Sequence, residues 1–530
     1  FKALSVENKI VMQEIQLRVL PKEASDQEIL TQKVAYELGI KADTITHVQI
    51  LKRSIDARKY PVFYQLKVAV YIEEEYLEPT FENNYTNVKD AVTTVHIIGS
   101  GPAGLFAALE ALKTGIKPII FERGKDVKTR RRDLAAINKE GKVNTESNYC
   151  YGEGGAGTYS DGKLYTRSKK RGSVQEVLKT LVIHGAPLDI MVDAHPHIGT
   201  NKLPQLIENM RVVILEHGGE VHFDTKMTDL AVNNGKVESI TINGNQVVEV
   251  EHLVLATGHS ARDIYTLLND KKIDLEFKSF ALGVRVEHAQ QLIDKIQYKT
   301  EERGEFLPPA SYSLVNQVKD RGVYSFCMCP GGIIAPCATG EEEVVTNGWS
   351  PSKRNNPYSN SGIVTEVRWD DIPKFHKYGP LAGMYFQKSV EKRAWELGGK
   401  TQAVPAQRLL DFIKGKKSSS LPKTSYHPGI VSVELDEVFP NFITNALRDG
   451  LKNFGNKMNG YQTNEAVLHA TESSTSSPVR IPRDKITLQH PTVSGLYPCA
   501  EGAGYAGGIV SAAIDGIKVI QQIQLLKENS

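Results

Sequence analysis

The sequence predicts an α/β protein in which a parallel-sheet domain is split by an insertion and preceded by a small α+β domain. Three observations predict this fold class. A glycine-rich turn at 99–104 stands between an apolar strand and a helix. Apolar strands run into glycine turns again near Gly258 and Gly502, far along the chain. The first ninety residues follow the order β-α-β-β, which is typical of a small sheet covered by a helix.

Length and composition allow about three globular domains. The chain has 530 residues, of which 40% are hydrophobic and 24% are charged, with a net charge of +2. This balance does not indicate a nucleic-acid coat or a polybasic membrane surface. The apolar segment 508–526 contains Asp515, Lys518 and three glutamines, so we expect a packed helix there. Five scattered cysteines and a first segment without a leader pattern indicate a cytoplasmic protein.

Residues 1–90 are expected to form the small α+β domain. Alternating apolar residues predict its strands, at 10–20, 44–55 and 62–72. Ser25 is the expected N-cap of a helix that runs to Leu38 and ends at Gly39. The domain has 12 basic and 14 acidic residues, which argues against an RNA-binding appendage. The acidic, turn-rich segment 73–90 is the expected linker.

A dinucleotide site is predicted where the strand 94–98 meets the following helix. Gly99 and Gly101 lack a Cβ, so the backbone can turn tightly and approach a pyrophosphate at the helix N-terminus. Glu122 ends the next strand 18 residues after Gly104, the spacing of an acid that binds ribose hydroxyls and disfavours NADP. The candidate contacts are Gly99, Ser100, Gly101, Pro102, Ala103, Gly104 and Glu122.

Later segments favour FAD over NAD at this site. The strand 253–256 runs into a turn that ends at Gly258, and a strand near the C-terminus runs into Glu501 and Gly502. The Glu501 carboxylate suits a ribityl hydroxyl. The helix that begins near Gly508 and Ile509 would direct its N-terminus at the flavin ring. A simple NAD dehydrogenase needs none of these late elements.

The predicted domains follow from this assignment. A discontinuous, Rossmann-type FAD-binding domain is built from 93–275 and 482–530. The segment 276–481 is inserted as a mixed α+β cap or substrate domain. Residues 1–90 precede both. We expect FAD to be held non-covalently, because no His or Cys stands out as a tether.

A second glycine-rich loop, 152–162, has five glycines in eleven residues and cannot form a helix or strand interior. Its backbone N–H groups suit an anion or the flavin edge, although a surface loop is the alternative. The candidate contacts are Gly154, Gly155, Ala156, Gly157 and Ser160. Arg123 and the cluster 130–132 lie beside the first turn, where one or two could contact FAD and a solvated helix face suits the others.

With these segments in view, the chain resembles the uncharacterised family of FAD-dependent dehydrogenases in the glutathione-reductase-like FAD/NAD(P)-binding superfamily. The matching segments are GEGGAGTYSDGKL at 152–164, HPHIGT at 195–200, SFCMCPGG at 325–332, SSPVRI at 476–481 and EGAGYAGG at 501–508. The resemblance implies FAD and an α+β domain ahead of the flavin domain. It implies no particular substrate.

Two cations are candidate catalytic residues. Lys163 follows Asp161 in the second glycine-rich loop and would lie near the flavin. Arg480 precedes the last strand and would be a buried cation for an anionic substrate or the reduced flavin, with a structural ion pair as the alternative.

Cysteines and histidines leave further alternatives open. Cys327 and Cys329 would share one face of a strand, and buried structural thiols are favoured over a redox role. His195 and His197 could contact substrate or FAD, although Thr200 as the N-cap of the next helix explains part of that motif. No metal site is expected.

The leading hypothesis is an FAD-dependent oxidoreductase that transfers a hydride between a small molecule and flavin N5. NAD(P)H is retained as a transient reductant, although no second strand-linked glycine motif indicates a dedicated domain for it. The alternatives are an FAD enzyme that acts on RNA, and a flavin-binding sensor or assembly protein.

Overall fold

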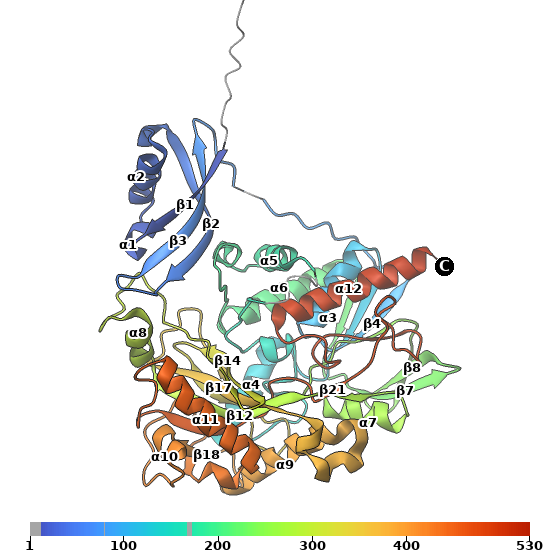
Figure 1. The fold of residues 1–530 in the computed structure, drawn as a ribbon. Coiled ribbons are helices and arrows are strands. Elements are labelled where there is room, and N and C mark those ends of the chain that lie inside the picture. The colour runs from blue at the N-terminus through green and yellow to red at the C-terminus, as the bar shows by residue number, and fades with distance from the viewer. Residues whose placement is uncertain (1–11, 79, 167–171, 530) are drawn as a thin grey trace, which may run out of the picture.

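A computed structural model describes residues 12–78, 80–166 and 172–529. Its N-terminal unit, blue in Figure 1, is an antiparallel sheet in the order β1-β3-β2, with a helical layer on one face. The elements are β1 Met12–Val19, α1 Pro21–Ala24, α2 Gln27–Leu38, β2 Ile45–Asp56 and β3 Phe63–Ile72. The predicted β-α-β-β order is therefore confirmed.

The helix start in this unit differs from the sequence-based prediction. Asp26, and not Ser25, is the N-cap of α2, because its Oδ1 accepts from the N–H groups of Glu28 and Ile29 at 3.0 and 3.1 Å. Ser25 instead ends α1. The positive end of the helix dipole also stabilises a carboxylate at the N-cap. Gly39 ends α2 in the left-handed region, as predicted.

A five-stranded parallel sheet forms the second unit, in the order β22-β10-β4-β5-β6. Its strands are β4 Thr94–Ile98, β5 Lys117–Phe121, β6 Glu220–His222, β10 Leu253–Leu255 and β22 Leu496–Pro498. The strand β22, close to the C-terminus, pairs in parallel with β10, which pairs with β4. The carboxyl ends of strands from three distant parts of the chain therefore meet at one edge.

Within the described ranges 80–166 and 172–529, six helices and a small three-stranded antiparallel sheet belong to the same unit as the parallel sheet. The helices are α3 Pro102–Lys113, α4 Val127–Glu140, α5 Val174–Ile183, α6 Leu203–Glu216, α7 Arg262–Asp270 and α12 Ile509–Glu528. The small sheet is β7 Met227–Asn233, β8 Lys236–Ile242 and β9 Gln246–Glu249.

A seven-stranded sheet forms the third unit, in the order β13-β14-β17-β12-β20-β18-β19. Its strands are β12 Phe280–Ala289, β13 Val315–Val318, β14 Arg321–Cys329, β17 Tyr358–Val367, β18 Val404–Arg408, β19 Ile430–Ser432 and β20 Val467–Glu472. The associated helices are α8 Gln290–Tyr298, α9 Ala382–Leu397, α10 Leu409–Lys414 and α11 Asn441–Lys457. Figure 1 shows α9, α10 and α11 along the outer side of this sheet.

Short elements complete the fold. Two pairs of strands lie outside the larger sheets, β15 Ile333–Pro336 with β16 Thr346–Trp349, and β11 Glu276–Phe277 with β21 Val479–Arg480. The second pair lies where the chain passes between the parallel and the seven-stranded sheets. The 3₁₀ turns are η1 Ala42–Thr44, η2 Gly155–Gly157, η4 Leu188–Met191, η5 Trp369–Asp371, η6 Pro373–Leu381 and η7 Leu435–Glu437. The predicted domain limits near 275 and 481 fall beside the pair β11 and β21, and they stay predictions.

The helix α12 lies against α3 on the parallel sheet (Figure 1). Of the helices in the described parts of the chain, α12 alone has the length and apolar character of a membrane span, and half of that window is buried. A Cβ at Gly516 would lie 2.2 Å from the carbonyl oxygen of Ala103, so the two helix backbones touch. This packing agrees with the packed helix that the sequence predicts.

The contact between α12 and α3 generates a stability prediction. We expect Gly516→Ala to lower the free energy of unfolding by about 1–2 kcal/mol, because the overpacking outweighs the gain in helix propensity. Urea unfolding followed by circular dichroism measures the change. The exposed Lys518→Ala on the same helix is the control, with an expected change within about 0.5 kcal/mol. Equal stability of the two variants would contradict the close packing.

Candidate functional site

A cleft of about 390 Å³ lies at the carboxyl edge of the parallel sheet, against the seven-stranded sheet. Segments distant in sequence line it. Most of the lining residues belong to the segments 98–103, 121–123, 150–151, 155–163, 225–227, 256–264, 326–327, 500–501 and 507–509, although not every residue of each segment reaches the wall. Ligand sites are commonly clefts of this size at the carboxyl edge of a parallel sheet.

The first glycine turn is shaped by close backbone contacts. A Cβ at Gly104 would lie 1.9 Å from the carbonyl oxygen of Gly99, and a Cβ at Gly99 would lie 2.8 Å from that of Ala256. Gly101 is different, because its nearest neighbour would be Gly155 Cα at 4.0 Å. Two glycines thus permit the turn, and the third leaves space at the cleft wall beside the α3 N-terminus.

The carboxylate of Glu122 joins the two glycine-rich loops. Its Oε2 accepts from the backbone N–H and the hydroxyl of Ser100, both at 2.9 Å. Its Oε1 accepts from the N–H groups of Gly124 and Gly152, also at 2.9 Å. Four donors occupy about four lone-pair sites of a buried carboxylate. Glu122 lines the cleft, as the sequence suggests, but its hydrogen bonds hold the protein's own loops.

The second glycine-rich loop passes between the N-termini of α3 and α12. A Cβ at Gly155 would lie 3.2 Å from Gly101 Cα, and a Cβ at Gly157 would lie 3.4 Å from the Ile509 side chain. Arg130 holds this loop from behind, because it donates to the carbonyl oxygens of Asn148 and Glu153 at 2.7 and 2.9 Å.

The basic cluster 130–132 does not reach the cleft. Arg130 is fully buried behind the loop, and burial lowers its pKa. Arg131 and Arg132 are exposed. Arg123 does line the cleft, but it pairs with Glu146 and Asp263 at 2.7 and 2.9 Å. Contact of one or two of these arginines with FAD therefore stays a prediction for Arg123, while Arg130 stabilises the loop and Arg131 and Arg132 form the solvated face.

The α12 N-terminus opens into the cleft. Gly508 and Ile509 line it together with Ala512 from the first helical turn. An added Cβ at Gly507 or Gly508 would meet no atom within 4 Å. The free N–H groups of a 20-residue helix thus face space that can hold an electronegative group.

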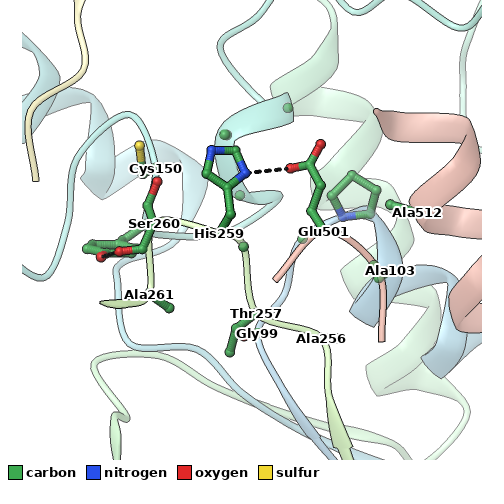
Figure 2. A pocket seen from close by; sticks show the side chains of 18 of the residues that line it. Gly99, Ala103, Cys150, Ala256, Thr257, His259, Ser260, Ala261, Glu501 and Ala512 are labelled. Atoms are coloured by element: carbon green, nitrogen blue, oxygen red, sulfur yellow. Dashed lines mark hydrogen bonds and ion pairs between the residues drawn. The ribbon is translucent and has the colours of Figure 1, made fainter. Parts of the chain in front are cut away.

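His259 is a functional candidate that the sequence analysis missed. Figure 2 shows its ring directed at the Glu501 carboxylate, with Nδ1 3.5 Å from Oε2. Both ring nitrogens are buried, and Nε2 has no partner among the described residues, whereas Nδ1 has only the Glu501 contact. Because buried polar atoms normally have partners, the free Nε2 at the cleft wall indicates a ligand. The available signal was its position directly after Gly258.

Lys163 lies where the second loop meets the seven-stranded sheet. Its Nζ contacts the carbonyl oxygen of Met328 and lies 3.8 Å from Sγ of both Cys327 and Cys329. It is also 3.6 Å from the carboxylate of Asp161. Burial alone would lower the pKa of Lys163, but the attraction of the thiols and the carboxylate raises it above its usual range. Lys163 is thus a cation at the cleft wall.

The predicted candidates divide between those that line the cleft and those that do not. The residues that line it are Gly99, Gly101, Pro102, Ala103, Glu122, Arg123, Gly155, Ala156, Gly157, Ser160, Lys163, Gly258, Glu501, Gly508 and Ile509. The residues Ser100, Gly104, Gly154 and Gly502 are not part of its wall and instead shape the adjoining turns.

Three further predictions are corrected. Arg480 is exposed and lies 3.8 Å from Glu276, because it stands on the outer side of the short strand β21. His195 and His197 do not line the cleft, and His197 Nε2 instead contacts the carbonyl oxygen of Ser352 at 3.1 Å. Thr200 is not an N-cap, because α6 begins after Lys202 without a side-chain cap.

Comparisons with known proteins were made for the whole chain. A family described as "FAD-dependent protein, C-terminal domain-like" matches residues 279–475, and a domain of unknown function matches 11–71. An uncharacterized protein of Clostridium beijerinckii is 40% identical over 517 residues, which cover 94% of this chain and 96% of that protein.

Solved structures give weaker likenesses. The flavin-dependent brominase Bmp2 is 14% identical with a TM-score of 0.35, over 83% of this chain and 80% of that one. A geranylgeranyl bacteriochlorophyll reductase-like protein of Thermoplasma acidophilum is 14% identical with a TM-score of 0.33, over 82% and 80%. Likenesses this weak do not assign the chain to a superfamily, so membership of the glutathione-reductase-like superfamily stays a prediction.

The four hydrogen bonds of Glu122 generate a second prediction. In Glu122→Gln, the amide NH₂ faces either the Ser100 donors or the two glycine N–H groups, so buried donors lose their acceptor. We expect the protein to lose about 2–3 kcal/mol of stability, measured by urea unfolding without added cofactor. The exposed Glu249→Gln serves as the charge-matched control. If both variants unfold at the same urea concentration, the carboxylate does not hold the loops.

Proposed function

We propose, from the premise that this chain belongs to the same family as the Clostridium beijerinckii protein, that it is an FAD-dependent oxidoreductase acting on a small molecule in the cleft. The matched C-terminal domain is that of FAD-dependent proteins, and the cofactor is FAD. The observation that carries the proposal is the meeting of two glycine-rich loops, the turn at Gly258 and the α12 N-terminus around one cleft.

The residues at the cleft suit the parts of FAD. The α3 N-terminus beside Gly101 offers N–H groups and space for a pyrophosphate. The α12 N-terminus favours the electron-rich edge of a flavin ring. His259 and Glu501 offer polar atoms for hydroxyl groups. When bound, FAD supplies two-electron transfer through flavin N5.

The chain itself would orient the reactants and limit access of water. Phe326 and Cys327 bring the end of β14 to the cleft, so the seven-stranded sheet covers the side opposite the glycine turns. Lys163 supplies a charge that can hold an anionic group of a substrate, and its raised pKa keeps it protonated at neutral pH. We expect the substrate or electron acceptor to be a small molecule rather than a nucleic acid.

The cysteines support a reducing compartment. All five are free thiols. Because long-lived thiols are typical of the cytosol, we retain the cytoplasm as the proposed location.

The absorption spectrum of the purified protein tests the proposal first. We expect the bands of oxidised flavin, with all flavin released on acid precipitation because it is not covalently attached. Anaerobic addition of NADH, NADPH or candidate metabolites should bleach these bands for at least one donor. A protein that holds no flavin after incubation with FAD would overturn the cofactor assignment. A bound flavin that no donor reduces would favour a sensor over an enzyme.

The unpartnered Nε2 of His259 generates a separate prediction. His259→Leu should weaken FAD binding by about three- to tenfold, because a hydrogen bond to the ligand is lost. It should change the free energy of unfolding of the apoprotein by no more than about 0.5 kcal/mol, because Nε2 has no protein partner among the described residues and the contact of Nδ1 with Glu501 is long, at 3.5 Å. Titration of the apoprotein with FAD by fluorescence measures the affinity. Exposed His427→Leu is the control, and a loss of apoprotein stability would assign His259 a structural role.

A further inference from the structure

Cys327 lies at a distorted point of the strand β14. The pairing of β14 with β17 shifts register between Phe326 and Cys329, which marks a β-bulge. Cys327 itself has φ of 47°, in the left-handed region that non-glycine residues rarely adopt. Bulges and such backbone conformations concentrate next to active sites. The distortion places Cys327 on the cleft wall, whereas Cys329 is fully buried behind it.

Lys163 is directed at this pair of thiols. Its Nζ lies 3.8 Å from each Sγ. The other cation facing the pair is Arg285, whose Nη1 lies 3.5 Å from the carbonyl oxygen of Cys327. Arg285 is already paired with Glu472 at 2.6 Å. Lys163 is therefore the cation that can stabilise a thiolate, because the charge of Arg285 is already neutralised by Glu472.

The carboxylate of Asp161, which lies near Lys163, is likewise paired with another cation. Asp161 lies 3.6 Å from Lys163 but is bound more closely by Arg354, at 2.6 Å. The titratable groups that face Cys327 are Cys329, Lys163, Arg285, Asp161 and Glu472. The local balance favours one negative charge on a sulfur atom.

The two thiols differ in acidity. A hydrogen bond from the Cys329 thiol, followed by the attraction of Lys163 and Arg285, lowers the pKa of Cys327 well below its usual range, although burial opposes this. The same hydrogen bond and burial raise the pKa of Cys329. The Cys329 Sγ also donates to the carbonyl oxygen of Cys327 at 3.2 Å, which keeps the two residues together. Cys327 is thus the more acidic thiol of the pair.

Two other thiols line the same cleft and provide a comparison. Burial raises the pKa of Cys150 and, more strongly, that of Cys337. No lysine contact is recorded for either among the described residues. A position on the cleft wall therefore does not by itself make a cysteine acidic.

We propose that Cys327, Cys329 and Lys163 form a dithiol redox centre on the wall of the cleft, whose substrate is a low-molecular-weight disulfide. The Cys327 thiolate attacks one sulfur of the disulfide, forms a mixed disulfide and releases the first thiolate. Cys329 transfers its proton to the released thiolate and attacks the Cys327 sulfur, which forms the Cys327–Cys329 disulfide and releases the second thiolate. The substrate is reduced to two thiols, and the protein dithiol is oxidised by the same two electrons.

This inference goes beyond the proposed function and is tested without it. The centre uses only side chains of the chain, so the apoprotein should show it. A failure of the thiol chemistry would leave the flavin spectrum and FAD binding unaffected, whereas a protein without FAD could still carry a reactive Cys327.

The first experiment is alkylation of the full-length apoprotein with iodoacetamide between about pH 5 and about pH 9, with the sites identified by mass spectrometry. We expect Cys327 to react first, with a midpoint below the value of about 8.5 for a free thiol, because its thiolate persists to lower pH. Cys150 and Cys337 are the internal controls and should stay unmodified at neutral pH. Lys163→Met should raise the midpoint by about one pH unit or more, and Lys163→Arg should restore it.

The second experiment is incubation with oxidised glutathione. The wild-type protein should lose two hydrogen masses and gain a disulfide between Cys327 and Cys329. Cys329→Ser should stop at a glutathione adduct on Cys327, and Cys327→Ser should form neither product. Circular dichroism of each variant verifies folding.

Three results would overturn the proposal. They are a Cys327 midpoint at the free-thiol value, alkylation that does not depend on the charge at position 163, and a wild-type protein that keeps the glutathione adduct without forming the internal disulfide. The wild-type measurements decide the first and third, so they stand even if a variant fails to fold.

Discussion

The buried carboxylate of Glu122 is the constraint on which the cleft depends. It accepts four hydrogen bonds from Ser100, Gly124 and Gly152, and so ties the turn after β4 to the end of β5 and to the second glycine-rich loop. A buried carboxylate is stable only when its lone pairs are satisfied. The loops therefore have one arrangement that satisfies it, and in that arrangement Gly155 lies against Gly101.

This arrangement of the loops brings the N-termini of α3 and α12 to the same cleft. The second glycine-rich loop lies between the N-termini of α3 and α12. The backbones of these two helices touch further along α12, where Gly516 lies against Ala103. Both helices then present unpaired N–H groups to the same space. Arg130, buried behind the loop, supports it from the side away from the cleft.

Two side chains of the cleft wall stand out by their surroundings. His259 has a buried Nε2 without a partner in the described residues, and Lys163 is held beside two thiols. Both come from segments that follow a glycine turn. The seven-stranded sheet contributes the opposite wall through the bulged end of β14. The cleft thus lies between glycine-rich turns of the parallel sheet and the thiols and lysine found where the two sheets meet.

The sequence by itself determined the local elements of this protein. The strand–turn–helix at 94–113, the β-α-β-β order of the first unit and the glycine positions follow from hydrophobic periodicity and from the absence of a Cβ, which are properties of neighbouring residues. Most of the predicted glycine contacts do line the cleft. Only the tertiary structure decided which charged side chains face it. Arg480 is exposed and lies near Glu276, and Arg130 donates its hydrogen bonds to loop carbonyl oxygens. His259 contacts Glu501, and Cys327 contacts Lys163, in each case across more than a hundred positions of sequence. Burial and pairing of a charge depend on these distant partners, which no local pattern records.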